Sequence, residues 1–208
     1  MSSTIFYRII SAVVIGAIFI TALVQNTTLF YILTTALFLG MSYEWVALTK
    51  NTSYLYLGLL IIPIPIASLI GVKIMFPDGR LLLAYFIGIW IVDTFAMIGG
   101  KIIGGKKLCP SLSPNKTYSG LFVGSFASGI ALHFLGSIYM FMDVKIATFL
   151  FGVINALISQ SSDLFMSYFK RKFKVKDFSS LIPGHGGVLD RFDSIILTSP
   201  LLFLYLYI

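Results

Sequence analysis

Residues 81–99 read LLLAYFIGIWIVDTFAMIG, and this stretch decides the fold class because Asp93 is its single charged residue. An apolar run of about 20 residues is long enough to cross the hydrocarbon core of a bilayer as a helix. The whole chain has the same character: 58% of its residues are hydrophobic, 11% are charged, and its mean hydropathy is +0.95. This composition argues against a soluble globular domain.

Comparable apolar runs recur along the rest of the chain. They lie near residues 8–24, 28–48, 54–75, 119–141, 145–166 and 193–208. We therefore expect an all-α integral membrane protein with about seven transmembrane helices, in a single domain over residues 1–208. No small-x-small cleavage pattern follows the first run, which favours a retained helix over a signal peptide. Pro63 and Pro65 are expected to kink the third span.

The positive charges predict the orientation of these spans. With a cytoplasmic N-terminus and seven spans, the cytoplasmic side receives all but three of the 15 Lys and Arg residues; the exceptions are Lys73, Arg80 and Lys145. Lys and Arg favour the cytoplasmic side of a membrane protein. The net charge of +7 is thus explained by topology and by a polar site, without a nucleic-acid partner. The prediction is a multi-pass protein of the cell inner (plasma) membrane with its site facing the cytoplasm.

Polar residues are unevenly distributed between two parts of the chain. Residues 1–80 are N-terminal spans with plain loops, and their polar exception is Glu44, near the cytoplasmic end of the second span. Residues 81–208 contain two polar loops on the cytoplasmic side. The first, from Gly99 to about Ser119, has four lysines among glycines, prolines and hydroxyls. Such a loop does not form a long helix and suits the binding of an anion as a lid.

The second polar loop follows the sixth span. It reads SYFKRKFKVKDFSSLIPGHGGVLDRFD over residues 167–193 and holds four Lys, two Arg, three Asp and one His. Cations and a glycine-rich loop suit phosphates, and grouped carboxylates suit a divalent metal. His185, between Gly184 and Gly186–Gly187, either contacts a phosphate or belongs to a structural turn; the sequence leaves both open.

One helical stripe enters this loop. Asp163, Ser167, Lys170 and Arg171 are spaced i, i+4, i+7 and i+8, which places them on one face of a helix. A carboxylate, a hydroxyl and two cations on one face suit a metal–phosphate site. The alternative is that the cations only anchor the helix end at the membrane interface. Asp163 favours the functional interpretation, because an ionisable group at membrane depth is costly and needs a partner.

Two further carboxylates end the loop. Asp190 and Asp193 are spaced i, i+3, so they share a face if the last helix begins at residue 190. Metal ligation is one interpretation, and capping of a helix N-terminus, where negative charge is favoured, is the other. Asp93 either joins the same polar cavity or pairs with one of the many lysines; no cation occurs within its own span, which favours the cavity.

The two loops together resemble the phosphatidate cytidylyltransferase (CDP-diacylglycerol synthase) family. The second loop matches that family's signature at Ser167, Lys170-Arg171, Lys176-Asp177, Pro183 to Gly187 and Asp190-Arg191-Phe192-Asp193. The first matches it at Asp93-Thr94, Gly100-Lys101, Gly104, Lys107-Leu108 and Ser113 to Gly120. The chain departs from the family pattern at Phe95, Met97, Tyr118, Ser119 and Ser162. The resemblance covers roughly residues 90–195 well.

This resemblance implies a reaction in which CTP and phosphatidate give CDP-diacylglycerol and pyrophosphate. It implies a magnesium ion, leaves a second, monovalent cation open, and suggests a homodimer in the membrane lipid. The implied metal ligands are Asp163 and Asp190, with Asp193 in support. The implied phosphate-binding residues are Ser167, Lys170, Arg171 and Lys176. Lys116 and Thr117 would contact nucleotide or head group, while His185, Gly186 and Gly187 shape the pocket and Asp93 lines the cavity.

Two other functions remain open from sequence. A CTP-dependent kinase of a lipid alcohol would share the nucleotide and the metal but would release CDP. A membrane transporter or anion channel would also place charges within spans. The clustering of charge in two loops on one side of the membrane argues against a permeation path.

Overall fold

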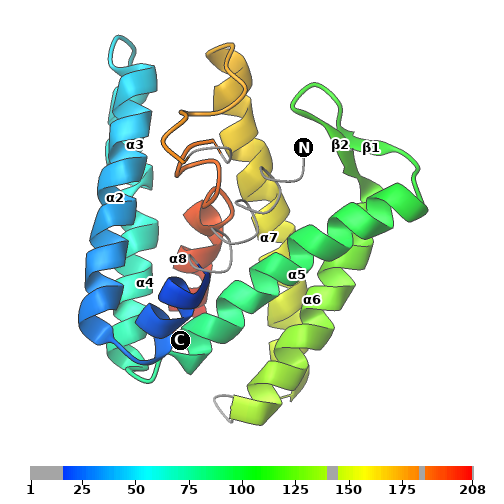
Figure 1. The fold of residues 1–208 in the computed structure, drawn as a ribbon. Helices are drawn as coiled ribbons and strands as arrows, with labels where there is room; N and C mark the ends of the chain where they lie inside the picture. Colours follow the sequence, from blue (N-terminus) through cyan, green and yellow to red (C-terminus); the bar gives the residue numbers. More distant parts are fainter. Residues whose placement is uncertain (1–15, 140–144, 183–185, 208) are drawn as a thin grey trace, which may run out of the picture.

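A computed structural model describes residues 16–139, 145–182 and 186–207, which form a bundle of helices with one small hairpin (Figure 1). Residues 16–24 are helical. The helices that follow are α2 (Thr27–Thr49), α3 (Tyr54–Ile61), α4 (Pro63–Met75) and α5 (Arg80–Ile102). Strands β1 (Lys107–Cys109) and β2 (Ser113–Thr117) precede α6 (Tyr118–Tyr139), α7 (Lys145–Lys172) and α8 (Ile195–Tyr207).

Five segments of the described chain are long and apolar enough to cross a membrane. They are residues Thr27–Thr49, Tyr54–Met75, Arg80–Ile102, Tyr118–Gly136 and Ile146–Lys172. α8 is a shorter apolar helix. The expectation of a helical, multi-pass membrane protein is confirmed in this form. The count of seven spans stays a prediction, and half of the first expected span lies outside the described residues.

The expected kink in the third span is a break between two helices. α3 ends at Ile61 and α4 begins at Pro63. A proline lacks the backbone N–H that would continue the hydrogen-bond ladder, and its ring clashes with the preceding turn, but it is well suited to the first position of a new helix. The span therefore restarts at Pro63.

Close packing of α5 against α6 places the first polar loop. A Cβ at Gly120 would lie 2.4 Å from the Ala96 carbonyl oxygen, and one at Gly124 would lie 2.9 Å from that of Val92. Small residues of this kind allow membrane helices to approach closely. The loop itself is shorter than expected, because α5 continues to Ile102, and it contains an antiparallel hairpin that the all-helical prediction did not include.

The two polar loops lie at one end of the bundle. The carboxyl ends of α2 and α7, the β1–β2 hairpin, and the C-terminal loop, defined here as residues 173–182 and 186–194, all lie toward the top of Figure 1. α8 then runs back down beside α4 and α7. Segments that are distant in sequence are thereby gathered into one polar region.

Candidate active site

An ion pair joins the hairpin to α7. The Lys116 ammonium of β2 lies 2.8 Å from Asp163 Oδ2, and Asp163 Oδ1 accepts a hydrogen bond from the Ser194 hydroxyl at 2.7 Å. Asp163 therefore connects the first loop to the end of the C-terminal loop. Thr117 is buried beside it, and its hydroxyl accepts the Gly120 N–H at 3.0 Å, which caps the first turn of α6.

Two further carboxylates, those of Asp93 and Asp193, lie near Asp163. Asp93 of α5 accepts a hydrogen bond from Gln160 Nε2 at 3.3 Å and interacts electrostatically with Asp163 and Lys116. Asp193 is buried and interacts electrostatically with Asp163. Burial and the nearby Asp163 carboxylate raise the pKa of Asp193 well above its usual range, because burial disfavours a charged carboxylate and two negative charges close together repel each other. This part of the site is therefore rich in negative charge.

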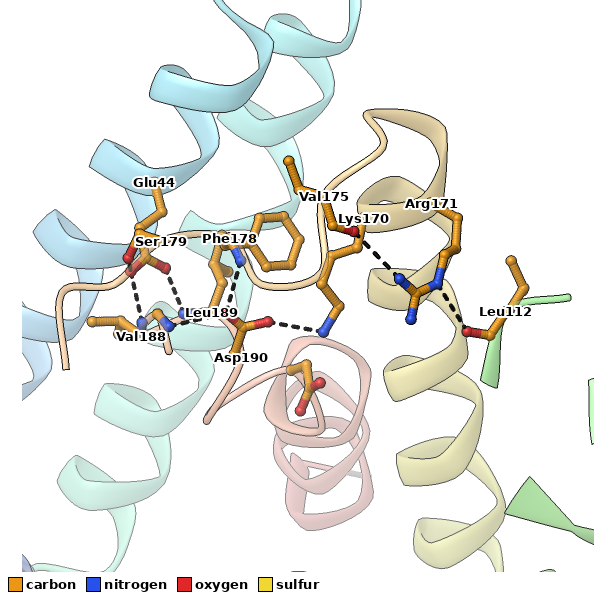
Figure 2. Close-up of polar contacts among 12 residues, drawn as sticks. Glu44, Leu112, Lys170, Arg171, Val175, Phe178, Ser179, Val188, Leu189 and Asp190 are labelled. Atoms are coloured by element: carbon orange, nitrogen blue, oxygen red, sulfur yellow. Dashed lines mark hydrogen bonds and ion pairs between the residues drawn. The ribbon is translucent and has the colours of Figure 1, made fainter. Parts of the chain in front are cut away.

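Asp190 has a different environment. Its Oδ1 accepts a 2.8 Å hydrogen bond from the Lys170 ammonium, and its Oδ2 accepts the N–H groups of Phe178 at 2.7 Å and Gly187 at 3.0 Å (Figure 2). The side chain of Asp190 is 4% exposed. The last helix begins at Ile195, so the condition under which Asp190 and Asp193 would share a helical face is not met.

The predicted stripe on α7 faces the C-terminal loop through three of its members. Asp163 contacts Ser194, and Lys170 contacts Asp190. The guanidinium of Arg171 donates to the carbonyl oxygen of Val175 in that loop and also to that of Leu112 in the hairpin, both at 3.4 Å (Figure 2). Arg171 therefore links α7 to the tip of the hairpin. Ser167 lies half-buried on the same stripe.

The remaining predicted residues lie around the C-terminal loop. Lys176 is exposed at its start. Gly186 has a φ of 88°, in the left-handed region that favours glycine, and pairs with Ile182 in an isolated bridge. Gly187 donates its N–H to Asp190. His185, with Pro183 and Gly184, lies outside the described residues.

Two departures from the family signature have clear structural partners. The Ser162 hydroxyl donates to the Asp193 carbonyl oxygen and accepts the Leu197 N–H at 3.3 Å, so it fixes Asp193 at the start of α8. The Ser119 hydroxyl donates to the Gly104 carbonyl oxygen and lies 3.0 Å from the Thr117 hydroxyl. Both serines fasten a polar loop to the bundle.

Sequence reasoning gave no role to a residue on which the C-terminal loop depends. Glu44 of α2 is fully buried and accepts hydrogen bonds from Ser179, Val188 and Leu189 (Figure 2). The signal in the sequence was its isolation, since an acidic side chain in an apolar span needs a partner. Its partners, two of them backbone N–H groups, could not be read from residue types.

Two cavities of different character meet at Asp93. One, of about 670 Å3, is the more polar, and its lining includes three lysines, Lys101, Lys107 and Lys116, beside Asp163. The other, of about 380 Å3, is mainly apolar, and its lining includes Phe19, Phe86, Ile89, Trp90, Arg191 and Phe192. Asp93 lines both. A charged reactant and an apolar one can therefore approach the same carboxylates from two sides.

Comparison with known proteins places this site in a family. The sequence profile described as "Cytidylyltransferase family" matches residues 53–208. This chain belongs to the cytidylyltransferase family. The phosphatidate cytidylyltransferase of Rickettsia typhi is 49% identical over 96% of this chain and 90% of its own length, and that of Rickettsia prowazekii is 48% identical over the same shares. The phosphatidate cytidylyltransferase of Staphylococcus saprophyticus is 43% identical over 56% of this chain and 45% of its own.

A cytidylyltransferase uses CTP and generally needs a divalent metal, for which carboxylates are suitable ligands. Among residues 16–139, 145–182 and 186–207, no three His, Cys, Asp or Glu side chains are grouped so as to hold a metal by themselves. The paired carboxylates of Asp163 and Asp193 still fit a metal that takes one or two protein carboxylates and completes its shell with substrate phosphates and water. Their mutual repulsion is what a cation would relieve.

Proposed function

We propose that this protein transfers the cytidylyl group of CTP to phosphatidate, giving CDP-diacylglycerol and pyrophosphate for phospholipid synthesis. Membership of the cytidylyltransferase family and the near full-length relatives named phosphatidate cytidylyltransferase support this reaction. The observation in the structure that carries the proposal is the junction of a basic cavity and an apolar cavity at Asp93. A nucleotide and a lipid are reactants of these two kinds. None of the relatives compared is a kinase or a transporter.

The basic cavity suits the triphosphate of CTP. Lys101, Lys107 and Lys116 line it, and the Thr117 hydroxyl lies at its edge. Lysine ammonium groups stabilise phosphate oxygens and the charge that moves onto pyrophosphate as it leaves. Ser167, Lys170, Arg171 and Lys176 are proposed as further phosphate contacts at the entrance from the C-terminal loop, with His185, Gly186 and Gly187 shaping the loop.

The apolar cavity suits the diacylglycerol part of phosphatidate. Its aromatic and aliphatic walls include residues of the membrane-spanning helix α5, and its charged lining residues are Arg191 and Asp93, of which Asp93 also lines the basic cavity. Lipid tails bound there would hold the head group at the boundary between the cavities. Positioning of both reactants in this way lowers the entropic cost of bringing two phosphates together.

The chemistry needs orientation more than proton transfer. An oxygen of the phosphatidate phosphate attacks the α-phosphorus of CTP, a new P–O bond forms, and the bond to pyrophosphate breaks with its electron pair on the leaving group. Because the attacking phosphate is already ionised, no strong general base is required. The lysines around the basic cavity and Lys170 neutralise the negative charge that would otherwise keep the two reactants apart.

We propose Mg2+ as the divalent metal, held by Asp163 and Asp193. Asp190, which the resemblance also implies as a ligand, is paired with Lys170 and would take the supporting part. When bound, the ion would neutralise negative charge on the phosphates and stabilise the leaving pyrophosphate. Asp93 would orient this carboxylate group through its contact with Gln160. A second, monovalent cation belongs to the same proposal.

We also propose where the protein lies in the cell. The excess of Lys and Arg on the loop end of the bundle favours a cytoplasmic site in the cell inner membrane, reached by CTP from the cytoplasm. The family resemblance favours a homodimer and gives no role to nucleic acid. We treat residues 1–208 as one transmembrane domain, with catalytic residues in 81–208.

The test is product analysis with purified protein in detergent, supplied with phosphatidate, CTP and Mg2+. The expected products are pyrophosphate and CDP-diacylglycerol, with loss of both in an Asp163→Asn variant. Release of CDP with a phosphorylated lipid alcohol would instead identify a kinase. If the folded wild-type protein showed no turnover, the transporter hypothesis would have to be considered again.

A further inference from the structure

Glu44 is the acidic side chain that sequence analysis singled out and that the proposed reaction does not use. It lies near the carboxyl end of α2, before the segment that the family profile matches. Its side chain is fully buried. Oε1 accepts the Ser179 hydroxyl at 2.6 Å and the Val188 N–H at 2.7 Å, and Oε2 accepts the Leu189 N–H at 2.7 Å. Both oxygens are therefore used, and all three partners lie in the C-terminal loop.

The same loop binds Asp190 through the neighbouring residues. The loop has two arms, residues 173–182 and residues 186–194. On the first arm, the Phe178 N–H donates to Asp190, while the next residue, Ser179, donates to Glu44. On the second arm, the Gly187 N–H donates to Asp190, while the Val188 N–H donates to Glu44. Each arm is thus held between two carboxylates on opposite sides, as Figure 2 shows. The orientation of these peptide groups depends on both.

The space at Gly187 reflects this arrangement. A Cβ at this position would lie 2.6 Å from Glu44 Oε1 and 2.8 Å from its carboxyl carbon. The glycine is required because the carboxylate passes so close to the backbone. Trp45, the next residue of α2, stacks on Phe178 and packs edge-on against Phe169 of α7, so the end of α2 is fixed relative to the loop and to the helix that carries Lys170.

We propose that Glu44 is a positioning residue, which holds the two arms of the C-terminal loop so that Asp190 is presented to Lys170. The expected loss of activity rests on the proposed function, whereas the expected change in the position of the loop does not. Residues that orient a site group through its hydrogen bonds typically alter activity about 10- to 100-fold when they are replaced. Glu44 touches neither reactant in this proposal and acts through the loop.

The first test compares Glu44→Gln with Lys73→Met. Glutamine keeps the size of the side chain but offers one oxygen, and its NH2 group would face a backbone donor. Lys73 is the matched control: it is buried, and it donates to the carbonyl oxygens of Leu23 at 2.7 Å and Pro77 at 2.7 Å, near the opposite end of α2. Both variants remove a buried charge that holds backbone groups.

We expect kcat of Glu44→Gln to fall about 10- to 100-fold, with KM for CTP and phosphatidate changed less than about 2-fold. We expect Lys73→Met to lose activity only in proportion to any loss of folded protein, which a thermal melt measures. Wild-type kcat in Glu44→Gln, or a loss that matches its folded fraction, would overturn the proposal.

The second test uses double variants, because Gly187→Ala creates a clash only while the Glu44 carboxylate is present. Gly187→Ala should reduce kcat in the wild-type background and should have a smaller effect in the Glu44→Ala background, where the space is open. Equal effects in the two backgrounds would contradict a role that depends on this contact.

The third test does not depend on the reaction. Hydrogen–deuterium exchange should show faster exchange at Phe178 and at 187–189 in Glu44→Gln, with no such change in Lys73→Met. Unchanged exchange would overturn the proposal whatever the enzyme's substrate. If the wild type releases no pyrophosphate but exchange changes as expected, the proposed function fails while the role of Glu44 in shaping the loop stands.

Discussion

Asp190 and Asp193 are three residues apart in one loop but have opposite surroundings. Asp190 is neutralised by Lys170 and by two backbone N–H groups, whereas Asp193 is buried beside another carboxylate, Asp163. Asp190 therefore holds the loop in place and is also a candidate metal ligand. The two carboxylates of Asp193 and Asp163 repel each other, which lowers the stability of the fold unless a cation binds or one carboxylate is protonated. Spacing in a motif therefore does not give its acidic residues one role.

The largest expected effect comes from Asp163, which belongs to the crowded side of this comparison. Asp163→Asn would keep the size of the side chain but remove the charge that pairs with Lys116 and faces Asp193. We expect kcat/KM to fall about 100- to 1,000-fold, as when a group that stabilises transition-state charge is lost. Pyrophosphate release at several Mg2+ concentrations measures this effect. Activity within 10-fold of wild type would remove Asp163 from the proposed metal site.

Lys170→Met tests the neutralised side. It would leave the Asp190 carboxylate buried without its cation, and breaking one half of a buried pair costs about 3 kcal/mol or more. We therefore expect a lower melting temperature as well as lost activity. The double variant Lys170→Met/Asp190→Asn should recover part of the stability and none of the activity. Equal melting temperatures for wild type and Lys170→Met would show that the pair does not hold the loop.

Sequence patterns predicted the helices and the candidate site residues but not the hydrogen bonds that connect these residues. Apolar runs placed the centre of each described span, and Pro63 marked a break, because length and hydrophobicity determine what can cross a membrane. The spacing on α7 predicted that Asp163 and Lys170 face the same way, and both contact the C-terminal loop. Side-chain periodicity on a helix is a local property, which one sequence can reveal.

Contacts made by irregular backbone were not predictable. The hydrogen bonds from Phe178, Gly187, Val188 and Leu189 depend on the path of a loop, and every residue type offers the same N–H group. The separation of Asp190 from Asp193 has the same origin, since the last helix begins at Ile195. The β1–β2 hairpin was missed because residues 107–117 are rich in proline, serine and lysine and do not show a strand pattern.

A smaller effect is expected at Ser162, which holds Asp193 in place through backbone contacts. Ser162→Ala would leave the Leu197 N–H and the Asp193 carbonyl oxygen without this partner, at a cost of about 1–2 kcal/mol. We expect a modest fall in melting temperature and a reduction of kcat that exceeds the reduction in Ser199→Ala. Ser199 is a suitable control because it is also a buried serine, on α8, and its hydroxyl donates to the carbonyl oxygens of Pro65 and Ile195 away from the site.

The smallest expected effect is a gain in stability, in the variant Asp193→Asn. Burial and Asp163 raise the pKa of Asp193 well above its ordinary value of 3.8, so the unfolded chain releases this proton more readily than the folded protein does. Stability of the metal-free wild type should therefore decline as pH rises from about 4 through the raised pKa of Asp193. Asp193→Asn would remove that decline, since an amide does not ionise and can still accept the Ser194 N–H.

Melting temperatures measured across pH with a chelator present would test this last prediction. At pH 8 the Asp193→Asn variant should melt higher than the wild type by about 2 °C, equivalent to about 1 kcal/mol for a chain of this length. Asp190→Asn should melt lower, because its carboxylate is stabilised by Lys170. If both variants moved in the same direction, the contrast between the two carboxylates would be lost, and with it the reason to assign the metal to Asp163 and Asp193 before Asp190.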